Sequence, residues 1–244
     1  MKHRHPPKNL THLLFDLDGT ILGAWDFPLQ IRFIQKALKA MKQRSGLRKG
    51  LEALIKVKLE LENPSFEGHN LMRSHTVTSK VLGVSVEEAE KIMSETIGGL
   101  FPTLERFFFP IKGAQAFLAA VRERYTLILA TNPVWEPSII ELRVKWAGID
   151  PTIFKSITDG TKMNVVKPSP KYYEKILKDE GIQANQCMLI GNDLRNDLSA
   201  VSVGIPVFII SKRKQLREIT PDGSKVPAWT GNYAVLTEFL GVGR

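Results

Sequence analysis

The segment Leu13-Leu14-Phe15-Asp16-Leu17-Asp18-Gly19-Thr20 is an apolar strand candidate that ends in two carboxylates, a glycine and a hydroxyl. Residues two apart on an extended chain share a face, and where the strand ends both carboxyl groups can turn toward one crevice. Two like charges about 4 Å apart repel by about 4 kcal/mol at an effective dielectric of about 20. A folded protein tolerates them when a cation lies between them or when one carboxyl keeps its proton. Gly19 lets the backbone turn away at once, as it would also do in an ordinary polar turn.

Helical patterns alternate with apolar strands in much of the remaining chain. Strand candidates lie at residues 126–130, 187–190 and 205–210. This alternation predicts an α/β fold with a parallel sheet covered by helices on both faces. Residues 27–107 differ, because their apolar residues recur at spacings of three and four, as in helices. We therefore predict a core domain of residues 1–26 and 108–244 and an inserted helical domain of residues 27–107, with linkers at 25–27 and 109–110.

Polar residues follow the predicted strands at the points where they end. In parallel sheets, ligands bind beyond the carboxyl ends of the strands, so these side chains are expected to converge. Each of them could instead belong to a turn, a helix cap or a solvated loop, but their joint occurrence in this order favours one shared site. The candidates are Asp16, Asp18, Thr131, Asn132, Lys167, Asp193 and Asp197.

The residue types in this set suit phosphoryl transfer. The carboxylates of Asp16 and Asp193 are hard oxygen ligands of the kind that Mg²⁺ prefers. Lys167 adds a positive charge, and Thr131 offers a hydroxyl donor to phosphate oxygens. Positioning and charge neutralisation are most of what this reaction requires.

Four short motifs resemble those of the haloacid dehalogenase-like (HAD) superfamily. They are Asp16-Leu17-Asp18-Gly19-Thr20, Thr131, Lys167-Pro168, and Gly191-Asn192-Asp193 with Asp197. The resemblance implies a Rossmann-like core, and the inserted helical domain resembles the type C1 cap of that superfamily. It also implies that Asp16 attacks phosphorus to form an aspartyl-phosphate. Asp18 would protonate the leaving oxygen and then activate water, and Lys167 would hold Asp16 and the phosphate together.

The same resemblance implies a Mg²⁺ cofactor. Its ligands would be the Asp16 carboxylate, the Asp18 main-chain carbonyl and Asp193, while Asp197 would orient water around the metal. Thr131 and the Asn132 backbone would bind the phosphoryl group. The chain departs from the commoner Gly-Asp pattern at Asn192, and if that residue occupies the ligand position the metal site is weaker.

The expected function is a Mg²⁺-dependent phosphatase acting on a small, anionic phosphorylated metabolite. A phosphomutase would use the same nucleophile, and a haloacid dehalogenase or a non-catalytic binder of phosphorylated ligands are further alternatives. A dehalogenase expels a halide, which needs no general acid, so Asp18 speaks against it. Substrate contacts are expected in and near the helical domain, where Trp25 and Arg73 are candidates.

Composition and charge indicate which classes of binding partner to expect. The net charge is +9, but the cations are spread along the chain without interleaved aromatic residues, so no nucleic-acid partner is expected. The apolar runs are too short to span a bilayer. The single cysteine, Cys187, excludes an intrachain disulfide and is typical of a reducing cytoplasm. The sequence leaves the oligomeric state open.

Overall fold

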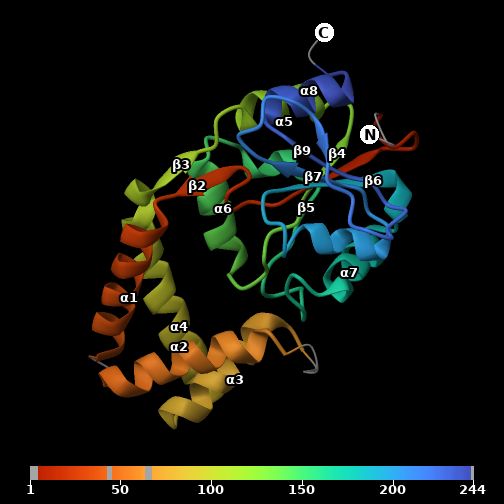
Figure 1. The fold of residues 1–244 in the computed structure, drawn as a ribbon. Coiled ribbons are helices and arrows are strands. Elements are labelled where there is room, and N and C mark those ends of the chain that lie inside the picture. The colour runs from red at the N-terminus through yellow and green to blue at the C-terminus, as the bar shows by residue number, and fades with distance from the viewer. Residues whose placement is uncertain (1–4, 43–45, 64–67, 243–244) are drawn as a thin grey trace.

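The computed structural model describes residues 5–42, 46–63 and 68–242, and within them the chain builds a seven-stranded sheet (Figure 1). The strand order is β5-β4-β1-β6-β7-β9-β8. Neighbours pair in parallel except for β8, which runs antiparallel to β9. The bounds are β1 His12–Phe15, β4 Thr126–Leu129, β5 Ser156–Ile157, β6 Cys187–Gly191, β7 Val207–Ile210, β8 Arg217–Glu218 and β9 Ala228–Gly231. The predicted α/β fold with a parallel, Rossmann-like sheet is confirmed.

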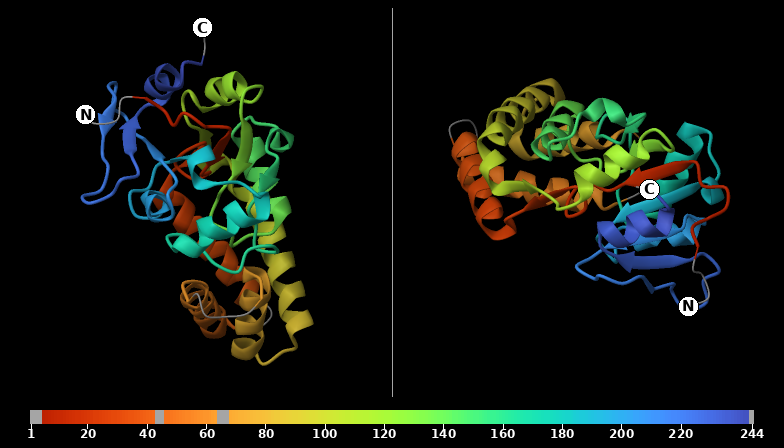
Figure 2. Two further views of the ribbon diagram at one scale, coloured as in Figure 1. Left: turned by 90° about the vertical axis from the view of Figure 1, so that its right-hand side faces the viewer. Right: turned by 90° about the horizontal axis from the view of Figure 1, so that it is seen from above.

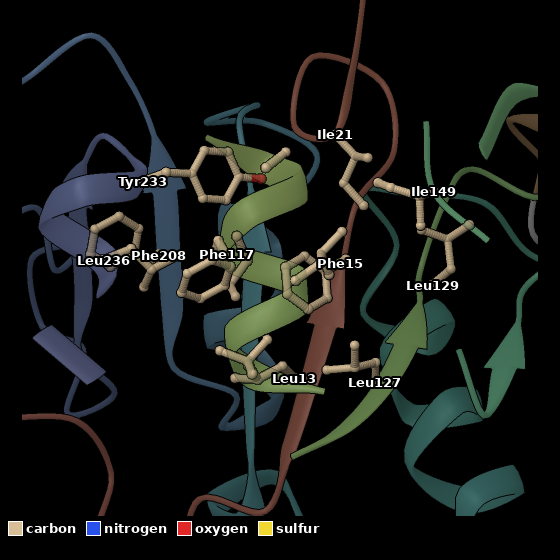
Figure 3. Packing of buried hydrophobic residues seen from close by; sticks show 14 of the residues in the cluster. Leu13, Phe15, Ile21, Phe117, Leu127, Leu129, Ile149, Phe208, Tyr233 and Leu236 are labelled. Atoms are coloured by element: carbon tan, nitrogen blue, oxygen red, sulfur yellow. The ribbon is translucent and has the colours of Figure 1, made fainter. Parts of the chain in front are cut away.

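Helices cover both faces of this sheet, and β1 lies in its interior between β4 and β6. Side chains alternate between the faces along a strand, so Leu13 and Phe15 enter one core while Leu14 enters the other. The first core contains Phe117, Tyr233 and residues of three helices, α5 (Ala114–Val121), α6 (Pro137–Trp146) and α8 (Tyr233–Leu240) (Figure 3). The second contains residues of α7 (Pro170–Glu180) and of the 3₁₀ helix η4 (Leu198–Val203). Because both faces are buried there, the interior strands β1, β4, β6 and β7 consist mostly of apolar residues.

A helical insertion, which we define as residues 26–107, follows the first strand of the sheet. It consists of α1 (Asp26–Lys42), α2 (Leu47–Leu61), α3 (Asn70–Leu82), α4 (Val86–Leu100) and the 3₁₀ helix η1 (Phe101–Phe107). Figures 1 and 2 show these helices grouped beside the sheet rather than on either of its faces. The Ser85 hydroxyl caps α4 by accepting a hydrogen bond from the Glu88 N–H at 3.1 Å. The domain boundaries at residues 27 and 107 stay a prediction.

The two segments that flank the helical insertion are hydrogen bonded to each other. The short strands β2 (Leu22–Ala24) and β3 (Phe108–Pro110) pair antiparallel, with Leu22 opposite Pro110 and Ala24 opposite Phe108. The residues predicted as the second linker, Phe109 and Pro110, lie in β3, and their role as a linker stays a prediction. Three-residue strands are too short to produce a readable alternation in the sequence.

The helical insertion also contacts the loops of the core directly. At the start of α3, the Asn70 N–H donates to the Met163 carbonyl at 2.8 Å and the Leu71 N–H donates to the Gly160 carbonyl at 2.9 Å. The Asn70 side chain donates to the Pro133 carbonyl at 3.0 Å. In the part of the chain that the structure describes, no helix combines the length and the apolar character needed to cross a bilayer.

Candidate active site

Asp16, Lys167 and Asp197 form a buried cluster at the carboxyl ends of the central strands. The Lys167 Nζ atom lies 2.8 Å from Asp16 Oδ1 and 2.7 Å from Asp197 Oδ1. Asp16 directly follows β1, Lys167 precedes α7, and Asp197 follows β6. All three are buried. We call these residues the charge cluster; it unites three of the side chains that the sequence predicted to converge.

Burial dominates the electrostatics of the charge cluster. It raises the pKa of the Asp16 carboxyl to about 7, since the charged form loses its water; Asp197 and Asp18 act in the same direction and Lys167 opposes them. Burial alone would lower the pKa of Lys167, but the neighbouring Asp16 and Asp197 carboxylates hold it well above its ordinary value. The cluster thus holds an ammonium that stays charged and a carboxyl that titrates near neutral pH.

Asp197 fixes the loop after β6 as well as the lysine. Its Oδ2 atom accepts hydrogen bonds from the main-chain N–H groups of Asn192 and Asp193, both at 3.0 Å. A Cβ atom on Gly191 would lie 2.3 Å from this same oxygen, so only glycine fits there. Asp197 is thus a positioning residue that links Lys167 to the loop holding Asn192.

The structure places Asn192, rather than Asp193, beside Asp16. The Thr20 hydroxyl lies 3.3 Å from Asp16 Oδ2 and 3.1 Å from Asn192 Oδ1, so these two oxygens converge. Asp193 instead caps its own turn: its Oδ1 accepts from the main-chain N–H groups of Arg195 and Asn196, at 2.7 and 2.8 Å. The metal-ligand role of Asp193 stays a prediction, and Asn192 is the residue of this loop whose side-chain oxygen lies on the Asp16 side.

The turn that carries Asp18 depends on Gly19. Its φ of +79° lies in the left-handed region, and an added Cβ atom would lie 2.2 Å from Asn192 Nδ2. The glycine therefore serves both the sharp turn and the close approach of Asn192.

The Asp18 carboxylate is paired with Arg143 of α6, a partner that the sequence did not reveal. The Arg143 guanidinium donates to Asp18 Oδ1 and lies over the Phe108 ring, with its carbon 5.9 Å from the ring centre. The Asp18 side chain is 55% exposed, whereas that of Arg143 is buried. The two residues are 125 positions apart, so no local pattern could have indicated the pair.

The predicted phosphate-binding residues lie at the end of β4. Thr131 is buried, and its main-chain carbonyl accepts from the Tyr172 hydroxyl at 2.7 Å and from the Thr158 hydroxyl at 2.8 Å. The Asn132 side chain accepts from the Lys167 N–H at 3.2 Å. This side chain therefore holds the backbone of Lys167 in place.

Of the two substrate contacts predicted near the helical insertion, the structure gives Arg73 a different role. The Arg73 side chain is enclosed, and its guanidinium donates to Asn70 Oδ1 at 3.2 Å and to the Asn164 carbonyl at 3.1 Å. Arg73 therefore joins α3 to a loop of the core, and a contact of this residue with substrate stays a prediction. Trp25 is 59% exposed and packs against Phe109, with ring centres 6.1 Å apart.

Two cavities lie between the helical insertion and the core. The first, of about 690 Å³, has a mixed lining in which most residues are polar or charged, among them Lys58, Asn132, Lys167 and Arg195. The second, about 710 Å³, is mainly apolar, and Asp18, Gly19, Asn192 and Arg143 line part of it. We call them the polar cavity and the apolar cavity.

The oxygen donors near Asp16 fit a weakly held Mg²⁺ ion. Among the residues that the structure describes, no group of three or more His, Cys, Asp and Glu side chains is placed to hold a metal. However, Asp16 Oδ2 and Asn192 Oδ1 converge on the Thr20 hydroxyl. Mg²⁺ often takes only one or two protein carboxylates and completes its shell with water and substrate phosphate. A set of one carboxylate and one amide oxygen is compatible with such a site.

Comparisons with known proteins bear on the family and the fold of the chain. The family model described as haloacid dehalogenase-like hydrolase matches residues 10–203. No curated protein gives a match. Among solved structures, a HAD phosphatase from Thermococcus onnurineus is 18% identical, with coverage of 96% of this chain and 100% of that one and a TM-score of 0.59. A 2-haloacid dehalogenase from Pseudomonas syringae pv. Tomato DC3000 is 19% identical, with coverage of 95% and 98% and a TM-score of 0.63.

A third similar structure was solved with magnesium bound. It is YfnB from Bacillus subtilis, 16% identical, with coverage of 96% of this chain and 100% of that one and a TM-score of 0.56. At such low identity these likenesses bear on the fold alone, and they include both a phosphatase and a dehalogenase.

Proposed function

Because the chain belongs to the haloacid dehalogenase-like hydrolases, we propose that it hydrolyses phosphoric monoesters through an aspartyl-phosphate on Asp16. The observation that carries this proposal is the second carboxylate, Asp18, two residues after Asp16 and on the lining of the apolar cavity. A hydrolase that expels an alkoxide or phenoxide gains from a group that protonates the leaving oxygen, whereas one that expels a halide does not.

In the first step, a carboxylate oxygen of Asp16 attacks phosphorus while the bond between phosphorus and the leaving oxygen breaks. The leaving oxygen takes a proton from Asp18. Lys167, 2.8 Å from Asp16 Oδ1, holds the nucleophile in place and offers positive charge to the phosphoryl oxygens. In the second step, water attacks phosphorus, Asp18 accepts the proton of that water, and Asp16 is released together with inorganic phosphate.

The ion pair with Arg143 positions the Asp18 side chain. To exchange a proton with the leaving oxygen or with water, the Asp18 carboxyl has to come within hydrogen-bond reach of that oxygen, so this pair has to loosen when substrate binds. Arg143 thus becomes a positioning residue for Asp18.

Asp16, Asn192 and the main-chain carbonyl of Asp18 are the groups that would hold Mg²⁺. When bound, the ion would reduce the repulsion between the Asp16 carboxylate and the phosphate dianion. With a single carboxylate among these ligands, we expect binding of the free ion to be weak and to strengthen when a phosphate is present.

A second candidate function is hydrolytic dehalogenation of short 2-haloalkanoates. The observation that favours it is Asn192, which leaves the position beside Asp16 without a second carboxylate for a metal. In this reaction an Asp16 oxygen displaces the halide from carbon, and water then hydrolyses the resulting ester.

One paired assay separates the two candidates. Phosphate release from p-nitrophenyl phosphate and chloride release from 2-chloropropionate are measured with Mg²⁺ and with EDTA. Asp16→Asn serves as the inactive variant and Asp193→Asn as the matched control. We expect Mg²⁺-dependent phosphate release that is lost in Asp16→Asn and kept in Asp193→Asn. Chloride release that persists in EDTA, without phosphate release, would favour the dehalogenase.

A further inference from the structure

The apolar cavity, of about 710 Å³, has a lining suited to a hydrophobic ligand. Among the residues that the structure describes, the charged ones in its lining are Asp18 and Arg143, which are paired with each other, and the uncharged polar ones are Gln30 and Asn192. The remaining lining consists of glycine, alanine and larger apolar residues. The larger ones include Phe33, Ile34, Phe101, Phe109 and Trp135.

The position of the apolar cavity links it to the leaving group. Asp18, Gly19 and Asn192 line it, and Asn192 shares the Thr20 hydroxyl with Asp16. In the proposed reaction the leaving oxygen has to lie within hydrogen-bond reach of Asp18. The organic group attached to that oxygen therefore extends into the apolar cavity, while the phosphoryl group stays at Asp16 and Lys167.

An aromatic wall of the cavity is already assembled. The ring centres of Phe101 and Trp135 are 4.9 Å apart, and Phe33 lies 6.2 Å from Trp135 and 6.4 Å from Phe101. All three contacts are close to perpendicular, a favourable arrangement for aromatic pairs. The rings come from α1, η1 and the loop after β4, so the wall joins the helical insertion to the core.

Other apolar side chains of the cavity still face water. Ile34 is 47% exposed and Phe109 is 38% exposed. A hydrophobic ligand would cover this surface and gain the free energy of removing it from water. A sugar or polyol would bring several hydroxyl groups to a lining with few partners for them, and each unpaired hydroxyl would weaken binding.

On the premise of the proposed function, we propose that the substrate is a phosphomonoester of an apolar alcohol or phenol. The apolar cavity holds its hydrocarbon or aromatic body, and its volume lies in the range of pockets that enclose small organic molecules. The polar cavity, lined by Lys58, Lys167 and Arg195, is the alternative: the organic group of a sugar or polyol phosphate would have to bind there.

The test begins with binding, which needs no turnover. Calorimetry measures the affinity for 1-naphthylmethylphosphonate, a non-hydrolysable probe with an aromatic body. Ile34→Gln places a polar amide on the cavity lining, whereas Ile31→Gln, on the same helix and 41% exposed, alters a residue outside that lining. We expect Ile34→Gln to weaken binding about tenfold and Ile31→Gln to leave it unchanged. Lys58→Ala, in the polar cavity, should also leave it unchanged.

Turnover then compares 1-naphthyl phosphate with glycerol 3-phosphate as kcat/KM. A preference of at least about tenfold for the naphthyl ester, reduced in Ile34→Gln alone, supports the assignment. A preference for glycerol 3-phosphate overturns it and leaves the phosphatase proposal standing. Binding of the phosphonate that is weakened by Lys58→Ala and not by Ile34→Gln also overturns it. Phosphonate binding that depends on Ile34, with neither ester hydrolysed, upholds the cavity assignment and refutes the phosphatase.

Discussion

Asp16→Asn should make the metal-free protein more stable at about pH 8 while abolishing turnover. The charge cluster holds two carboxylates for one ammonium, all buried. Above pH 7 the folded protein therefore carries a buried carboxylate whose charge is only partly compensated, because burial raises the pKa of Asp16 to about 7. Asparagine keeps an oxygen that can accept from Lys167, and it leaves Lys167 and Asp197 as a neutral pair.

The pH dependence fixes both the sign and the size of this effect. The folded pKa of Asp16 is about 7 and the ordinary value is 3.8, so protons favour the folded state. The contribution of the Asp16 carboxyl to the free energy of unfolding is fully present below pH 3.8 and is lost as the pH rises through 7. Each pH unit in that window costs the wild type about 1.4 kcal/mol, so its whole loss is at most about 4 kcal/mol. Asparagine does not titrate, so Asp16→Asn does not lose this stability as the pH rises. Its melting temperature at about pH 8 should exceed the wild-type value by roughly 5–15 °C.

The assay is thermal unfolding followed by circular dichroism in EDTA, at about pH 4 and about pH 8. The melting temperature of Asp16→Asn should equal that of the wild type at the lower pH and exceed it by the whole expected difference at the higher pH. Asp193→Asn, which removes a carboxylate outside the charge cluster, is the matched control and should show no such gain. A variant that is no more stable than the wild type at about pH 8, or equally favoured at both pH values, would refute the surplus-charge reasoning.

Three further changes probe the same site. Asn192→Asp supplies a second carboxylate beside Asp16 and should tighten Mg²⁺ binding at least about tenfold by calorimetry; unchanged affinity would mean that Asn192 is not a ligand. Lys167→Met leaves Asp16 and Asp197 buried without their shared ammonium and should cost about 3–5 kcal/mol in urea unfolding near neutral pH; a loss below about 1 kcal/mol would contradict the burial argument. Gly19→Ala places a Cβ atom 2.2 Å from Asn192 Nδ2 at a φ of +79° and should cost about 1–3 kcal/mol and lower turnover; full activity would show that this turn relaxes easily.

The sequence predicted the fold class and the convergence of three site residues because both follow from simple rules. Apolar strands that alternate with helices build a parallel sheet, and the carboxyl ends of parallel strands share one edge. Asp16, Lys167 and Asp197, far apart in the chain, therefore meet where the sequence places them. Their roles in catalysis stay a prediction.

The features that the sequence did not predict depend on contacts between distant segments. Which of Asn192 and Asp193 lies beside Asp16 depends on the turn that Asp193 caps, and the spacing of the residues in the sequence does not reveal that turn. The pairing of Arg143 with Asp18 reaches from α6 to the loop after β1. Arg73 resembles an exposed cation in the sequence, yet it is buried among main-chain carbonyls.

The paired strands β2 and β3 have a consequence for how such a protein can diversify. Because Leu22 faces Pro110 and Ala24 faces Phe108, the chain leaves the core and returns to it at the same place. The sheet order is therefore the same whatever lies between these two strands, so the intervening segment can be shortened, lengthened or exchanged at a small entropic cost. Asp16, Lys167 and Asp197 all lie outside that segment. The same catalytic core can in this way be combined with different inserted segments, each of which selects different substrates.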